Sequence, residues 1–169
     1  MQLSDIKDVL LTAIAIERYG QEYYSRLSKA VSEEEGKALM KSLERDEKEH
    51  EELFINEFNR LVGSKVPEKI DIKANLTSEA LDDIFRRWER SMHIGSEDVF
   101  AALETGIGTE QRSIDFYSDQ MCKSTDPELK DIFKKLVDIE KGHKKLLEDN
   151  VFHLKQDGSW WGYVPILEG

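Results

Sequence analysis

The sequence has little cysteine and little basic charge, and each shortage excludes a class of protein. Its 169 residues include one cysteine, Cys122, which is too few for a disulfide framework or a thiolate zinc site. We therefore expect a reducing compartment and predict a cytoplasmic location. Lys and Arg total 24 against 35 Asp and Glu, giving a net charge of −11. Nucleic acid and anionic membranes are disfavoured as partners, because both bind basic surfaces.

Long apolar runs and prolines are scarce as well. The longest apolar stretch near the N-terminus, residues 9–16, is bounded by Asp8 and Glu17 and is far too short to span a bilayer. The first eight residues lack the basic segment of a signal peptide. Only three prolines interrupt the chain. Long helices are therefore the natural expectation, because proline is the strongest helix breaker.

Four long segments have apolar residues at helical spacing and predict an all-α fold. These segments are residues 4–29, 32–63, 96–123 and 125–153. Ser32 and Glu35 form a capping-box pattern at the start of the second segment. Thr125 is expected to cap the fourth, with Pro127 in its first turn. Each end is expected to be correct to within a few residues.

The remaining segments are a crossover and a tail. The crossover, residues 64–95, begins as an extended loop and then shows the pattern of a short helix over residues 77–90. The tail, residues 154–169, is aromatic and not helical. We expect its Trp160, Trp161 and Tyr163 to pack on the bundle or on a neighbouring subunit. We expect Cys122 to be a small buried apolar residue.

An internal repeat relates the two halves of the chain by a shift of 93 residues. The matching pairs include Ile14 and Ile107, Glu17 and Glu110, Tyr24 and Tyr117, Leu43 and Leu136, Glu47 and Glu140, and His50 and His143. Each half therefore has a glutamate followed, 30 residues later, by Glu-x-x-His. The repeat predicts two similar helical hairpins.

The spacing of these residues brings them to one level of each hairpin. Residues equally distant from the turn of an antiparallel pair lie at the same height, so Glu17 should lie level with Glu47, about 22 Å from the turn. His50 and His143 follow their glutamates by one turn on the same face. That face is otherwise apolar, with Met40, Leu43 and Phe54 in one half and Phe133, Leu136 and Leu147 in the other. We therefore expect the four glutamates and two histidines to point inward.

Four carboxylates in an apolar core are strongly unfavourable when they are not compensated. Either they hold protons at raised pKa or a cation balances them. Oxygen and nitrogen donors without sulfur suit iron or manganese and suit a structural zinc site poorly. Four carboxylates also balance two divalent ions, and the set matches the ligands of ferritin-like carboxylate bundles.

Over residues 4–153 the chain resembles the rubrerythrin branch of the ferritin-like superfamily. The motifs that carry the resemblance are Ala13-Ile14-Ala15-Ile16-Glu17 with Tyr24, Glu47-x-x-His50, Gly106-Ile107-Gly108-Thr109-Glu110 with Phe116-Tyr117, and Glu140-x-x-His143. The resemblance implies a ferritin-like four-helix bundle over residues 1–153, built of two hairpins around a centre of two iron ions. Such a centre reacts with hydrogen peroxide or dioxygen.

The resemblance also assigns roles to individual residues. It implies that Glu17, His50, Glu110 and His143 are terminal metal ligands and that Glu47 and Glu140 bridge the two ions. Tyr24 and Tyr117 would hydrogen-bond the ligand carboxylates. Glu47, Glu140, Tyr24 and Tyr117 are therefore the residues expected to act in the reaction.

Two departures from the family pattern matter for function. Rubrerythrins proper also carry a rubredoxin module with paired Cys-x-x-Cys motifs, and a chain with one cysteine cannot. An external electron donor such as a rubredoxin is therefore expected. Rubrerythrins also place an extra carboxylate one turn after the third-helix ligand, where this chain has Ser113, a poor substitute as a ligand.

The leading hypothesis is a di-iron oxidoreductase, expected as a homodimer, that reduces peroxide or dioxygen. Manganese or another divalent metal is an alternative to iron. The rival functions are a ferroxidase that handles iron and a non-enzymatic bundle that is stabilised by metal. Small residues beside the ligands leave either space for a small substrate or space for close helix packing. These are Ala13, Gly20, Gly106 and Ser113.

Overall fold

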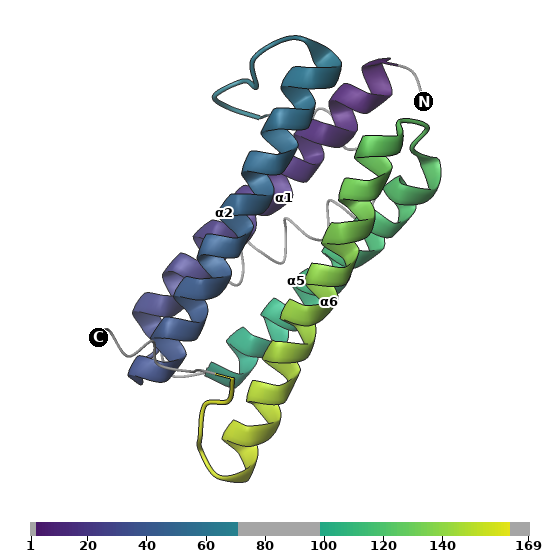
Figure 1. Ribbon diagram of the computed structural model, residues 1–169. Coiled ribbons are helices and arrows are strands. Elements are labelled where there is room, and N and C mark those ends of the chain that lie inside the picture. The colour runs from purple at the N-terminus through teal and green to yellow at the C-terminus, as the bar shows by residue number, and fades with distance from the viewer. Residues whose placement is uncertain (1–2, 71–98, 163–169) are drawn as a thin grey trace, which may run out of the picture.

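The computed structural model describes residues 3–70 and 99–162, which form two long helical hairpins lying side by side (Figure 1). The first hairpin consists of α1 (Leu3–Ala30) and α2 (Glu34–Val62), and the second of α5 (Val99–Lys123) and α6 (Pro127–Gln156). No strand occurs in these residues. The predicted all-α bundle of two hairpins is confirmed.

The start of α2 differs from the prediction by one residue. Its N-cap is Glu33, in an extended conformation, and the Glu33 side chain makes no capping hydrogen bond. The Ser32 hydroxyl instead donates to the Glu33 carboxylate at 3.2 Å. The predicted capping box is therefore wrong, because the hydroxyl is engaged by the adjacent side chain. At the other end, Gly63 has a left-handed φ of 69° and its amide donates to the Asn59 carbonyl, a common way to end a helix.

The cap of α6 is also one residue later than predicted. Asp126, not Thr125, is the N-cap, and its carboxylate accepts from the Leu129 amide at 2.9 Å. A charged carboxylate complements the helix dipole better than a hydroxyl. Pro127 is the first helical residue, as expected, and α6 runs to Gln156, past the predicted end at His153.

The crossover is described only in its first part. Residues 64–70 contain no helix, in agreement with the extended loop expected there. The short helix predicted over residues 77–90 lies outside the described residues, as does the predicted start of the third helix at Ser96.

Two apolar clusters fill the bundle, one on each side of its middle. One contains Leu10, Phe54, Phe58, Phe133 and Leu136, from the N-terminal halves of α1 and α6 and the C-terminal half of α2. The other contains residues from the opposite halves, namely Tyr24, Leu27, Met40, Leu43, Leu103 and Leu147. The glutamates and histidines of the repeat lie between these clusters, so both ends of the site are closed by apolar side chains.

The tail folds back on the bundle through residue 162. Trp160 packs against the second apolar cluster and covers Gly36, where a Cβ atom would lie 2.5 Å from the indole ring. The buried Asn150 holds the backbone of Trp161 through two hydrogen bonds, of 3.0 and 2.9 Å. The Trp161 side chain is 47% exposed and stacks on His153. Trp160 thus packs on the bundle as expected, and Tyr163 lies outside the described residues.

Two other expectations concern surface properties. Cys122 is exposed near the C-terminal end of α5, so the prediction of a buried thiol is wrong. None of the described helices has the length and apolar character needed to cross a membrane.

Candidate metal centre

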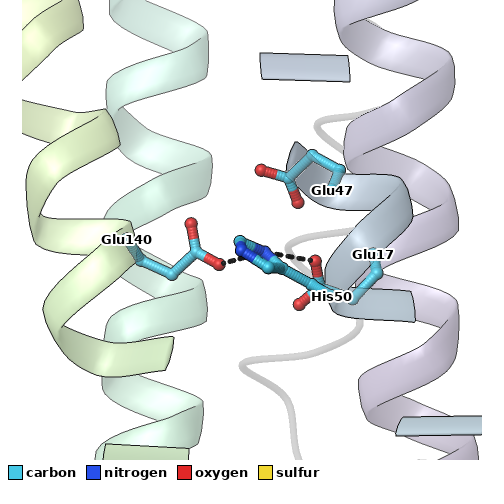
Figure 2. A group of neighbouring side chains, drawn as sticks. All are labelled: Glu17, Glu47, His50 and Glu140. Atoms are coloured by element: carbon cyan, nitrogen blue, oxygen red, sulfur yellow. Dashed lines mark ion pairs between the residues drawn. The ribbon is translucent and has the colours of Figure 1, made fainter. Parts of the chain in front are cut away.

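The structure brings all six residues of the repeat together in the middle of the bundle. They form two overlapping groups in which one donor atom from each residue lies within 4.8 Å of the others. The first group is Glu17, Glu47, His50 and Glu140, drawn in Figure 2, and the second is Glu47, Glu110, Glu140 and His143. Glu47 and Glu140 belong to both groups. All six residues are buried, with exposed fractions from 0% at Glu17 to 6% at His143.

Most of the close contacts cross from one hairpin to the other. Nδ1 of His50 on α2 lies 3.2 Å from Oε1 of Glu140 on α6 (Figure 2). Nδ1 of His143 on α6 lies 3.3 Å from Oε1 of Glu47 on α2. The 93-residue shift relates the two contacts, because His50 matches His143 and Glu47 matches Glu140. The two hairpins are therefore related by an approximate two-fold axis, as in a reciprocal interface.

Two tyrosines make the same kind of reciprocal contact. The Tyr24 hydroxyl on α1 donates to Glu110 on α5, and the Tyr117 hydroxyl on α5 donates to Glu17 on α1. Each tyrosine thus holds the glutamate of the opposite hairpin, not the one on its own helix. Burial is the largest cause that raises the pKa of each phenol well above 10, so both remain hydrogen-bond donors at neutral pH.

The carboxylates of the site are held at different pKa values. Burial, together with repulsion from Glu140, raises the pKa of Glu47 and of Glu110 well above 4.5. Burial would also raise the pKa of Glu140, but the adjacent rings of His143 and His50 outweigh it and lower that pKa to about 2. Without a cation, the cluster therefore balances its charge by keeping protons on some of its glutamates.

The two histidines respond to the same charges. Burial favours neutral imidazole, but Glu140 and Glu17 overcome it at His50 and raise its pKa to about 9. Asp46, Glu140 and Glu47 raise the pKa of His143 well above 6.5. At neutral pH in metal-free protein, both rings therefore carry an extra proton, which a bound metal would displace from the ligating nitrogen.

The donor atoms meet the requirements of a metal site. Four buried donor atoms lie in ion-pair contacts of 3.2–3.3 Å without a well-formed hydrogen bond, namely Glu17 Oε2, Glu47 Oε1, Glu140 Oε1 and His50 Nδ1. Nδ1 of His50 lies 3.3 Å from Oε2 of Glu17, close to the separation of about 3 Å between donors that share one divalent ion. Oxygen and nitrogen donors suit iron or manganese, so the residues fit the expected metals.

Comparison with known proteins places the chain in a family. The family model for rubrerythrin matches residues 8–150. The chain belongs to the rubrerythrin family. One similar solved structure is a two-domain protein from Anabaena variabilis with DJ-1/ThiJ/PfpI-like and ferritin-like domains. The TM-score is 0.69 at 22% identity, over 98% of this chain and 44% of that one.

At that identity the likeness establishes the fold alone, and it confirms the ferritin-like bundle. This rubrerythrin-family chain spans less than half the length of that structure. No curated protein matches it.

Sequence reasoning missed one acidic residue of this rubrerythrin-family site. Oδ2 of Asp46 lies 3.4 Å from Nε2 of His143, on the side of the ring away from the glutamates. Hydrogen bonding to His143 lowers the pKa of Asp46, so it is an anion at neutral pH. A carboxylate in this place orients a metal-binding imidazole. The repeat gave no signal for it, because the matching residue in the second half is Ile139.

The small residues beside the cluster do not leave open space. A Cβ atom at Gly20 would lie 2.7 Å from Oε2 of Glu47, and one at Gly106 would lie 3.2 Å from the Leu147 side chain. The Ser113 hydroxyl donates to the Thr109 carbonyl at 3.3 Å. At both glycines, side chains of the bundle occupy the space, which agrees with the alternative of close helix packing.

Replacing Tyr24 with phenylalanine should weaken metal binding to the second group by roughly 10- to 100-fold, the usual effect of removing a hydrogen bond to a ligand. Isothermal titration with Mn(II) would measure this. The matched control is Tyr23→Phe, because the Tyr23 hydroxyl donates to the Ala102 carbonyl and not to a glutamate. Equal Mn(II) affinities in the two variants would contradict the expected role of Tyr24.

Proposed function

We propose that this chain is a di-iron oxidoreductase that passes electrons from an external donor to hydrogen peroxide or dioxygen. The observation that supports it best is the overlap of the two groups, with Glu47 and Glu140 in both. A shared carboxylate can contact two ions at once, and paired ions suit reactions that need two electrons. Family membership supports the same conclusion.

In this proposal each group holds one ion. Glu17 and His50 would hold the first ion, and Glu110 and His143 would hold the second. Glu47 and Glu140, which belong to both groups, would help to hold both ions. When bound, the irons supply the redox chemistry, because each can change its oxidation state by one electron.

The protein contributes positioning and control of protons. Tyr117 and Tyr24 each donate to one oxygen of a terminal glutamate, which fixes the direction of the carboxylate. Glu47 and Glu110 release their protons when cations enter, because a metal ligand must be deprotonated. The apolar clusters at both ends keep bulk water away, which strengthens every charge interaction inside.

The partners follow from the composition. The one cysteine of these 169 residues cannot form a rubredoxin centre, so we propose that electrons come from a donor outside them, such as a rubredoxin. We further propose a homodimer that acts in the reducing cytoplasm, where the exposed Cys122 stays a thiol.

The proposal predicts that bound Fe(II) in anaerobically loaded protein is oxidised to Fe(III) on mixing with peroxide or air-saturated buffer. The iron should stay bound at about two ions per chain and return to Fe(II) when a reductant is added. A rapid-mixing assay with a ferrous chelator would measure this. Iron that stays reduced would exclude the oxidoreductase and leave a bundle stabilised by metal. Accumulation of many irons per chain in a large assembly would identify an iron-storing ferroxidase.

A further inference from the structure

Gly20 lies on α1, one turn after Glu17, and its backbone lies against Glu47 of α2. A Cβ atom at residue 20 would lie 2.7 Å from Oε2 of Glu47, 2.9 Å from its Cδ and 3.0 Å from its Cγ. Three consecutive atoms of Glu47 would therefore be too close. Rotation of the carboxylate alone cannot relieve this contact, because Cγ and Cδ are included.

The helix itself does not need a glycine at this position. The glycines with positive φ in the described residues are Gly63, Gly158 and Gly162, so Gly20 has ordinary helical geometry. Glycine is among the poorest helix formers, and alanine is the best. A glycine in the buried middle of a 28-residue helix therefore has another cause, and the nearest atoms belong to Glu47.

We propose that Gly20 is a positioning residue for the metal centre, because its lack of a side chain lets Glu47 rest against α1 where its carboxylate serves both groups. The inference rests on the proposed function. In this position Oε1 of Glu47 faces Nδ1 of His143 at 3.3 Å while Oε2 lies over Gly20. A methyl group at residue 20 would push the carboxylate away from α1, and Glu47 is only 4% exposed, which leaves it little space.

Of the two halves of the repeat, the first has a glycine at this position and the second does not. The residue that matches Gly20 in the second half is Ser113, which carries a side chain bonded to the Thr109 carbonyl. The repeat therefore does not require glycine at this place. Because Glu47 belongs to both groups, its displacement affects both ions, whereas displacement of a terminal ligand would affect one.

The test is Gly20→Ala, with thermal unfolding of metal-free protein and anaerobic Fe(II) binding by equilibrium dialysis. We expect the unfolding temperature of the metal-free protein to fall, because the methyl group would press on the buried Glu47 side chain and outweigh the better helix propensity of alanine. Fe(II) affinity should fall at least tenfold for both ions. A plain packing role would lower the stability of the metal-free chain in the same way but leave the Fe(II) affinity unchanged.

Two glycine variants serve as controls. Gly142 is exposed on α6 and a Cβ there meets nothing within 4 Å, so Gly142→Ala should leave Fe(II) binding unchanged. Gly106→Ala tests buried packing, because its Cβ would meet Leu147 at 3.2 Å and no glutamate. It should lower stability without the tenfold loss of Fe(II) affinity. A similar loss in the Gly106 variant would overturn the inference.

The remaining outcomes separate this inference from the proposed function. Two irons in the parent with equal affinity in Gly20→Ala would overturn the role of Gly20 alone. Two irons in the parent that do not react with peroxide or air would overturn the proposed function alone, and a parent that binds no Fe(II) would overturn both. If Gly20→Ala does not fold, folding of Gly20→Ala/Glu47→Ala would identify Glu47 as the obstacle and support the inference. Failure of both to fold would overturn it.

Discussion

A Glu47→Ala chain should bind almost no iron, whereas a Glu17→Ala chain should keep about one ion. The parent should bind about two ions per chain. Glu47 belongs to both groups of donor atoms and Glu17 to one, so the first substitution removes a ligand from each ion and the second from a single ion. Metal analysis after anaerobic loading with Fe(II) and dialysis would measure the difference. Glu140→Ala should behave like Glu47→Ala, because Glu140 is the other shared residue.

The loss of iron in Glu47→Ala should not result from unfolding. Burial disfavours the charged form of Glu47 in metal-free protein, and His143 keeps Asp46 and Glu140 as partners, so the apo chain should stay folded. Glu51→Ala is a matched control on the same helix. Glu51 pairs with Arg18 and Gln21 outside the cluster, so this variant should retain both ions. Two ions in Glu47→Ala, or equal losses in the Glu17 and Glu47 variants, would contradict the shared role.

Much of this site could be predicted from the sequence, because its geometry depends on helical spacing. Glu17 and Glu47 lie 30 residues apart with the turn midway between them, and the rise of an α-helix then places them at one height. The flanking Leu43 and Phe54 showed which face is buried. The repeat supplied the second half of the site, and with it the pairing of Glu110 and Glu140.

The contacts between the hairpins could not be predicted in the same way. Spacing within a helix does not reveal that Tyr24 reaches Glu110 and not Glu17, because this depends on the two-fold arrangement of the hairpins. Asp46 is present in one half only, so the repeat could not reveal it. The N-cap predictions were wrong for a local reason, because adjacent polar residues such as Thr125 and Asp126 can both serve as the cap.

Metal-free and metal-loaded protein should respond to pH in opposite directions. In metal-free protein the folded-state pKa values of Glu47 and Glu110 lie above their ordinary value of 4.5. The folded state then binds more protons than the unfolded state, so stability falls as the pH rises above about 4.5. The folded-state pKa of His50 is raised from 6.5 to about 9, so its contribution is complete below pH 6.5 and is lost as the pH rises through 9.

The size of the metal-free trend can be estimated from His50 alone. Its pKa shift corresponds to about 3 kcal/mol, or roughly 6–12 °C in the unfolding temperature of a chain of this size. Glu140 acts in the other direction only at low pH, because its lowered pKa of about 2 makes stability fall below pH 4.5. We therefore expect the metal-free protein to be most stable near pH 5 and to lose at least 6 °C by pH 9.

Metal reverses the trend, because each ion must displace protons from the glutamates and histidines that bind it. Affinity then rises with pH, and at a free metal concentration of a thousand times the Kd each site adds about 4 kcal/mol. Thermal unfolding from pH 5 to 8.5 with and without Mn(II), which resists oxidation by air, would show two curves that diverge as the pH rises. His50→Gln should make the stability of metal-free protein depend less on pH. If the pH dependence came instead from the surface charge, with its net of −11, the variant would keep the slope of the parent. Parallel curves with and without Mn(II) would show that the cations do not replace protons at these residues.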